Sequence, residues 1–171
     1  LTGEAYKLPF HETFPNAYNI YWWERDCDDE TYNTTGGAYI ASYNDSFVFA
    51  YYGIENGWIS GKTGKISLEG AKNPTVSFDY VSTTAAKITV IVTTPEGDTL
   101  ARTFKAEETD EFIRVKMSLA DFVGQPWIRL TIRGDFDESG AFSYTNVNVL
   151  DLCGVDFEAT ISAPESVTAG Q

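Results

Sequence analysis

The fold is decided by a glycine-punctuated stretch, NGWISGKTGKISLEGAKNPTVSFDYV, which spans residues 56–81. Two short strand-like pieces, Trp58–Ser60 and Lys65–Leu68, are separated by glycines. A turn at Gly70–Pro74 leads into Val76–Tyr80, where apolar and polar residues alternate. Alternation with a period of two, bounded by Gly, Asn and Pro, predicts strands that bury one face.

The same alternation recurs along the chain and predicts an all-β protein. Further strands are expected at Leu8–Phe14, Ala38–Tyr43, Phe47–Tyr52, Lys87–Thr94, Thr99–Phe104, Phe112–Leu119, Trp127–Arg133 and Tyr144–Leu152. Charged loops are expected at Lys105–Glu111 and Gly134–Gly140, and one helical turn at Ala120–Val123. Roughly nine to eleven strands at this spacing favour a jelly-roll β-sandwich of two antiparallel sheets with almost no helix.

The composition is that of a folded domain. Of 171 residues, 43% are hydrophobic and 15% are aromatic, which excludes general disorder. The net charge of -13 disfavours binding to nucleic acid or an anionic membrane, because both require Lys and Arg. No apolar run approaches the ~20 residues that span a bilayer. The chain starts at Leu1, so we expect a mature or excised segment of a longer protein.

Two cysteines, Cys27 and Cys153, are present. A disulfide between them would tie an early loop to the end of the last strand, and two separate thiols are the alternative. Because the chain has one histidine and no CxxC pair, we expect no zinc site.

A long irregular loop, Asn16–Gly37, interrupts the strand pattern and carries several acidic residues. Long loops in compact domains are usually functional, and a metal can organise them. Calcium prefers carboxylate and carbonyl oxygens as ligands. We therefore predict one structural calcium site with Glu12, Asp26 and Asp28 as ligands, and a solvated acidic loop is the alternative.

Aromatic side chains are the candidates for ligand contact. The flat rings of sugar-binding β-sandwiches stack on pyranose rings, and we predict such platforms at Trp22, Tyr51, Tyr52 and Trp58. Aromatic residues on strands also build cores, so burial is the alternative for each of them.

Signals for catalysis are weak. His11 is the single histidine, so a Ser-His-Asp arrangement would have to use it. The sequence contains no GxSxG elbow, and Gly61-Lys62-Thr63 is not part of a full phosphate-binding GxxxxGK[S/T] motif, because Asn56 stands where that motif needs its first glycine; we predict no catalytic residues. The tripeptide Arg133-Gly134-Asp135 is displayed by some integrin ligands, and a strand end with a turn glycine is the alternative.

Several short motifs follow one another in a characteristic order. They are LPFHETF at residues 8–14, Trp23 followed by Asp26 and Asp28, the stretch 58–78, the stretch 112–124, and the strands at 128–132 and 144–149. In this order they resemble the cleaved-adhesin modules of Bacteroidetes surface proteins, the type found in gingipain haemagglutinins and related in architecture to MAM domains.

The resemblance implies a jelly-roll domain at residues 8–153, similar to concanavalin and galactose-binding domains, after a linker at 1–7. Residues 154–171 look like a linker and the start of a truncated Ig-like or PKD-like domain. The implied function is non-catalytic recognition or adhesion, as a monomeric module of an exported, multidomain bacterial surface protein that binds host protein or glycan. The alternatives are a carbohydrate-binding accessory domain of a secreted hydrolase and a structural spacer.

Overall fold

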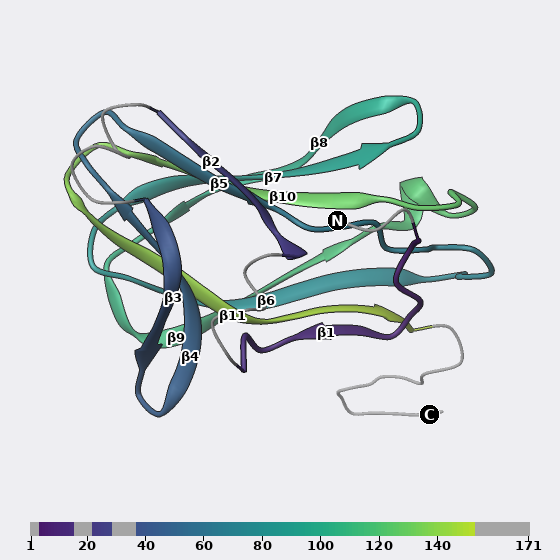
Figure 1. Cartoon of the computed structure of the whole chain (residues 1–171), viewed down its shortest axis with the longest axis horizontal. Helices are drawn as coiled ribbons and strands as arrows, with labels where there is room; N and C mark the ends of the chain where they lie inside the picture. The colour runs from purple at the N-terminus through teal and green to yellow at the C-terminus, as the bar shows by residue number, and fades with distance from the viewer. Residues whose placement is uncertain (1–3, 16–21, 29–36, 153–171) are drawn as a thin grey trace.

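The chain folds into two antiparallel β-sheets that pack face to face (Figure 1). The computed structural model describes residues 4–15, 22–28 and 37–152. In the six-stranded sheet the order is β3 (Ala38–Tyr43), β4 (Ser46–Gly53), β11 (Gly140–Asp151), β6 (Pro74–Ser82) and β9 (Thr109–Ser118), and β1 (Phe10–Glu12) pairs with the second half of β11. In the five-stranded sheet the order is β2 (Glu24–Cys27), β5 (Trp58–Lys62), β10 (Arg129–Phe136), β7 (Ala86–Thr94) and β8 (Gly97–Ala106).

This architecture confirms the predicted jelly-roll β-sandwich. The helical turn is also confirmed, as a 3-10 turn at Ala120–Phe122. In the described part of the chain, no helix is long and apolar enough to cross a membrane.

The alternation in the sequence becomes the burial pattern of the strands. On β6, Val76 and Phe78 are buried between the sheets, whereas Asp79 lies on the opposite side. On β7, Ile88 and Val90 are buried in the same way. Each such side chain stabilises the fold by about 1.5–3 kcal/mol relative to exposure, so the register of each strand is strongly specified.

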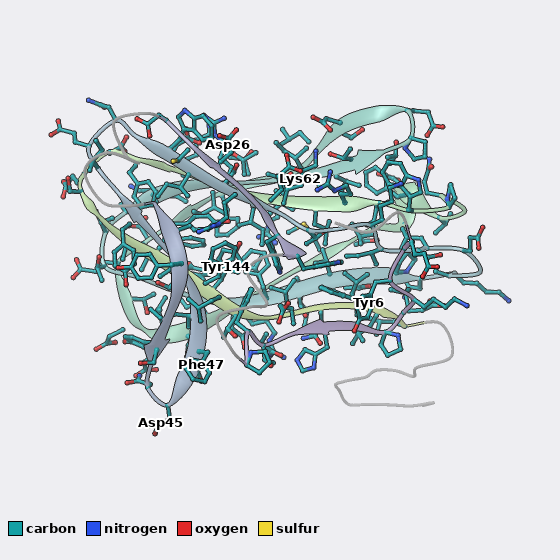
Figure 2. The ribbon with its side chains drawn as sticks, viewed as in Figure 1. Tyr6, Asp26, Asp45, Phe47, Lys62 and Tyr144 are labelled. Carbon is teal, nitrogen blue, oxygen red and sulfur yellow. The ribbon has the colours of Figure 1, made fainter. Side chains whose placement is uncertain are left out.

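A pair of tyrosines occupies the centre of the core, and Figure 2 shows Tyr144 between the two sheets. The rings of Tyr51 and Tyr144 lie edge to face with centroids 5.3 Å apart, and their hydroxyl oxygens are 2.6 Å apart. The Tyr51 hydroxyl also donates to the carbonyl of Ile132 at 2.8 Å, which links β4 to β10 in the other sheet. A Cβ at Gly61 would lie 2.7 Å from the Tyr51 hydroxyl, so this close approach requires glycine.

The strand predicted at Lys65–Leu68 is wrong. Ile66 forms isolated bridges with Tyr6 and Ile128, and no ladder extends from them because neither partner belongs to a strand. Tyr6 was expected in a linker, yet its backbone N–H donates to the carbonyl of Lys65 at 2.8 Å. The sandwich therefore includes residues before Leu8.

Three predicted loops contain strand residues. The irregular loop expected at 16–37 includes β2, which pairs with β5. Strands β8 and β9 extend through most of 105–111, because charged side chains face solvent there while Ala106 is buried. Strand β10 continues to the buried Phe136, which leaves residues 137–139 as the turn. Residues 153–171 lie outside the described residues, so the truncated second domain and the pairing of Cys27 with Cys153 stay predictions.

Candidate functional site

The six-stranded sheet has an outer face, which points away from the five-stranded sheet and is hollowed. On β4, Phe49 and Tyr51 point into the core, so Val48 and Ala50 project from the outer face. Val48 and Ala50 are nevertheless only 1% exposed. Something other than the core must therefore cover this face.

The two edges of the same sheet meet on this face. Tyr43 on β3 donates its hydroxyl hydrogen to the backbone carbonyl of Asp110 on β9, and its ring meets Phe112 edge to face at 5.7 Å between centroids. We call these contacts the Tyr43 tie. Four strand spacings separate β3 from β9 in the sheet order, so a flat sheet would hold them about 19 Å apart. The sheet therefore curls until its edges touch over the outer face.

The first hollow lies on one side of the Tyr43 tie and has a volume of about 580 Å³. Its lining combines apolar side chains, including Val81 and Tyr52, with hydroxyl and carboxylate groups such as those of Ser143 and Glu108. Tyr52 stacks against Tyr39 with ring centroids 4.9 Å apart. Burial and then the neighbouring Tyr39 raise the pKa of Tyr52, so its hydroxyl stays protonated and can donate a hydrogen bond.

The second hollow, about 490 Å³, lies on the other side of the tie, beside the β3–β4 hairpin. Figure 2 shows Asp45 at the tip of this hairpin and Phe47 next to it. Phe47 is 50% exposed and, with Phe112, gives this hollow an aromatic rim. The two hollows thus both combine aromatic rings with polar groups.

Asp79 and Asn146 line the second hollow and belong to a network of polar side chains. Arg114 donates two hydrogen bonds to the carboxylate of Asp79, at 2.8 and 3.1 Å, and Asn146 donates a third at 3.0 Å. Asn146 lies at a bulge of β11 with a φ of 56°, and its amide oxygen is 2.7 Å from the His11 ring. Burial raises the pKa of Asp79, but the bonds from Arg114 and Asn146 and the charge of Arg114 outweigh it and hold the pKa below its usual value.

The predicted aromatic platforms lie in three different environments. Tyr52 lines the first hollow, as a platform requires. Tyr51 is wrong as a ligand contact, because it is 0% exposed and its hydroxyl is bonded inside the core. Trp22 packs against Phe10 at 5.1 Å between centroids, and Trp58 lies on β5 of the other sheet. The ligand roles of Trp22 and Trp58 stay predictions, away from the hollows.

The tripeptide at 133–135 lies inside β10 and not at a loop tip. Arg133 binds Asp135 through two hydrogen bonds of 3.0 and 3.1 Å, and its guanidinium lies 4.3 Å from the centre of the Trp58 ring. Both charges are therefore engaged within the strand. The alternative, a strand end with a turn glycine, is also wrong, because Gly134 pairs with Ile59 and Ile88 inside the sheet.

The predicted calcium ligands are not gathered into a cage. Glu12 is buried and accepts hydrogen bonds from the backbone N–H of Phe14 at 2.8 Å and from the indole N–H of Trp23 at 3.4 Å. Asp28 accepts a bond from the backbone N–H of Trp58 at 3.2 Å. Among the described residues, no three Asp, Glu, His or Cys side chains form a group that could hold a metal. The described donors therefore do not fit a calcium ion, and the site stays a prediction.

Sequence reasoning missed most of the residues that surround the hollows. The sequence predicts strands or a loop at Tyr43, Asp110 and Phe112 and indicates no functional role for them. No local pattern identifies them, because residues 43 and 110 meet only through the curl of the sheet. Asn146 carried a weak signal, since its polar side chain interrupts the alternation of β11 at the bulge.

These features define the class of the protein as a jelly-roll β-sandwich with a hollowed outer face. No protein-family model matches the sequence, and a search of the curated proteins finds no match either. Among solved structures, the K3 cleaved adhesin domain of Lys-gingipain from Porphyromonas gingivalis is similar, with a TM-score of 0.62 and 10% identity over 82% of this chain and 98% of that chain. The fold that the sequence resemblance implied is thereby confirmed.

Two structures of carbohydrate-binding modules are also similar. TmCBM61, solved in complex with β-1,4-galactotriose, has a TM-score of 0.58 and 10% identity over 75% of this chain and 88% of its own. The CBM22-1–GH10 modules of a Clostridium thermocellum endo-1,4-β-D-xylanase were solved in complex with xylohexaose. They have a TM-score of 0.55 and 10% identity over 89% of this chain. This chain spans 30% of that larger protein.

Proposed function

We propose that this chain is a non-catalytic recognition module that binds a glycan on the outer face of the six-stranded sheet. The observation that carries the proposal is the hollowed outer face, with aromatic rings and polar groups side by side. A pyranose ring has apolar C–H faces and a rim of hydroxyls. Its faces stack on rings such as Tyr52, and its hydroxyls bond to neighbouring oxygen and nitrogen atoms.

The structural similarities support this proposal. The titles of two similar structures name an oligosaccharide, galactotriose or xylohexaose, as the bound molecule. The third is an adhesin domain. The same fold therefore occurs in modules whose work is binding, which favours a binding role for the present chain.

A role for Asp79 as a catalytic acid is disfavoured by its partners in the second hollow. A glycosidase needs a carboxylic acid whose pKa is raised so that it can protonate the leaving group. Burial raises the pKa of Asp79, but Arg114 and Asn146 lower it by more, so the pKa lies below its usual value and the carboxylate stays ionised. His11 is exposed and faces Asn146.

The wider setting of the module follows from the sequence resemblance. The chain is a monomeric part of an exported, multidomain protein at a cell surface or in the extracellular space. Its partner is a glycan, carried by a host surface or by a polysaccharide that a neighbouring hydrolase degrades. A glycan array with the wild type, Tyr52→Ala and Leu100→Ala tests the assignment.

The wild type is expected to bind a defined set of glycans. Tyr52→Ala should weaken that binding by about tenfold, the effect of losing one aromatic contact. Leu100 lies on β8 of the other sheet and is 62% exposed, so Leu100→Ala should bind like the wild type. Binding to matrix proteins and not to glycans would replace the proposal with adhesion to a host protein, and binding to neither would favour a structural spacer.

A further inference from the structure

The Tyr43 tie crosses the outer face between the two hollows. Each strand beneath it contributes residues to the hollows in the same order. Each strand places one outer-face residue in the first hollow and the next outer-face residue in the second. These pairs are Val81 and Asp79 on β6, Ser143 and Thr145 on β11, and Asp110 and Phe112 on β9. The hollows therefore lie in line along the strands, and the tie touches Asp110 on one side and Phe112 on the other.

The tie is supported from both edges of the sheet. Tyr43 contributes both a hydrogen bond, to the Asp110 carbonyl, and a ring contact, to Phe112. Tyr43 and Asp110 also line the first hollow, and Phe112 lines the second, so the contact stands at the boundary between the two hollows. A chain that lay along the strands across both hollows would have to pass through this contact.

The lining of the first hollow also limits the charge of a ligand. Its carboxylates are Glu108 and Asp110, and its other polar groups are hydroxyls such as those of Thr83 and Thr109. No Lys, Arg or His is among the described residues that line it. An anionic sugar would meet like charge without a cation to pair with, and the net charge of -13 would repel it further. A volume of about 580 Å³ is in the ordinary range of small-ligand sites.

From these observations we infer that the first hollow is a dead-end subsite, which takes the uncharged terminal sugars of a glycan up to the Tyr43 tie and excludes the interior of a polysaccharide. This inference rests on the proposed function, and it adds the class of ligand: neutral chain ends. Tyr43 is then a selectivity residue, because it closes the hollow against a continuing chain.

The test is an array that presents neutral glycans with a free terminus, the same glycans capped with sialic acid, and long neutral polysaccharides. The wild type is expected to bind the glycans with free termini. Its affinity for the capped glycans and for the polysaccharides should be lower by at least about tenfold, because at least one full contact is lost. Tyr43→Ala, which removes the tie, should gain about tenfold on the polysaccharides. Tyr43→Phe keeps the ring against Phe112 and should retain the selectivity of the wild type.

The outcomes separate the inference from the proposed function. The wild type could bind polysaccharides and free termini equally, and Tyr43→Ala could leave this binding unchanged. That result would overturn the dead-end subsite but leave glycan binding intact. No glycan binding by the wild type or by any variant would overturn both. A ligand-free measurement adds a separate check: nuclear Overhauser contacts between the rings of Tyr43 and Phe112 are expected in solution, and their absence would refute the tie itself.

Discussion

Removal of a hydroxyl from either central tyrosine should reveal the direction of the buried hydrogen-bond chain. Tyr51 donates to the carbonyl of Ile132, so its oxygen must accept the hydrogen of Tyr144 in the 2.6 Å contact. Tyr144→Phe removes one donor and leaves the bond from Tyr51 to Ile132 in place. Loss of one such bond costs about 0.5–1.5 kcal/mol in the free energy of unfolding.

The change Tyr51→Phe should cost more. It removes both bonds and leaves the Tyr144 hydroxyl without its acceptor inside the core, where both side chains are 0% exposed. Each buried polar group left unsatisfied costs about 1–3 kcal/mol, so we expect about 2–4 kcal/mol. In the double variant the Tyr144 hydroxyl is gone as well, and the protein should be no less stable than Tyr51→Phe alone.

Urea unfolding followed by fluorescence measures these differences, with an unchanged denaturant slope as the control for a common unfolding transition. For a chain of this size, each kcal/mol also lowers the Tm by about 2–4 °C. Equal costs for Tyr144→Phe and Tyr51→Phe would contradict this direction of the hydrogen-bond chain. Additive costs in the double variant would contradict it too, since residues in one network must couple.

Three further predictions follow from the same structure. Burial raises the pKa of both central tyrosines well above the ordinary value of 10.0, so the unfolded chain loses these protons at a lower pH than the folded protein. The free energy of unfolding should therefore be unaffected below pH 10 and should fall above it by about 1.4 kcal/mol per pH unit for each tyrosine. Urea unfolding at about pH 9 to 11, compared with the double phenylalanine variant, measures this fall. Gly61→Ala should destabilise the protein by about 1–3 kcal/mol through overpacking against the Tyr51 hydroxyl. The double variant Gly61→Ala, Tyr51→Phe should be destabilised by less than the sum of the two single changes, because the clashing hydroxyl is gone; unfolding midpoints measure both. Glu12→Gln should lower the Tm equally in calcium and in chelator, because its partners are protein N–H groups; a loss seen only with calcium would identify Glu12 as a calcium ligand.

The strand segments and the inward face of each strand could be predicted from sequence. The alternation at 76–80 and 88–92 is a local pattern, and burial of an apolar face is the dominant favourable free energy of folding. The error at 65–68 has a physical reason too. Those residues alternate like a strand, but whether Ile66 extends a ladder depends on the partners that tertiary contacts bring to it.

The site was harder to predict, as Tyr51 and Tyr52 show. Both are aromatic residues on one strand, and both were expected to contact ligand. Adjacent positions on a strand point to opposite faces, so one is sealed in the core and the other lines the first hollow. Alternation alone separates the two faces but does not say which of them meets the second sheet.

The all-β character and the inward residues of most strands can be inferred from sequence, because each depends on neighbours along the chain. The shape of the outer face depends instead on contacts between segments far apart in the chain. Tyr43 and Asp110 come together because twist and curvature accumulate across five strands, a sum over pairings that no single segment encodes. The hollows, and with them the proposed specificity for neutral chain ends, arise from that accumulated curvature.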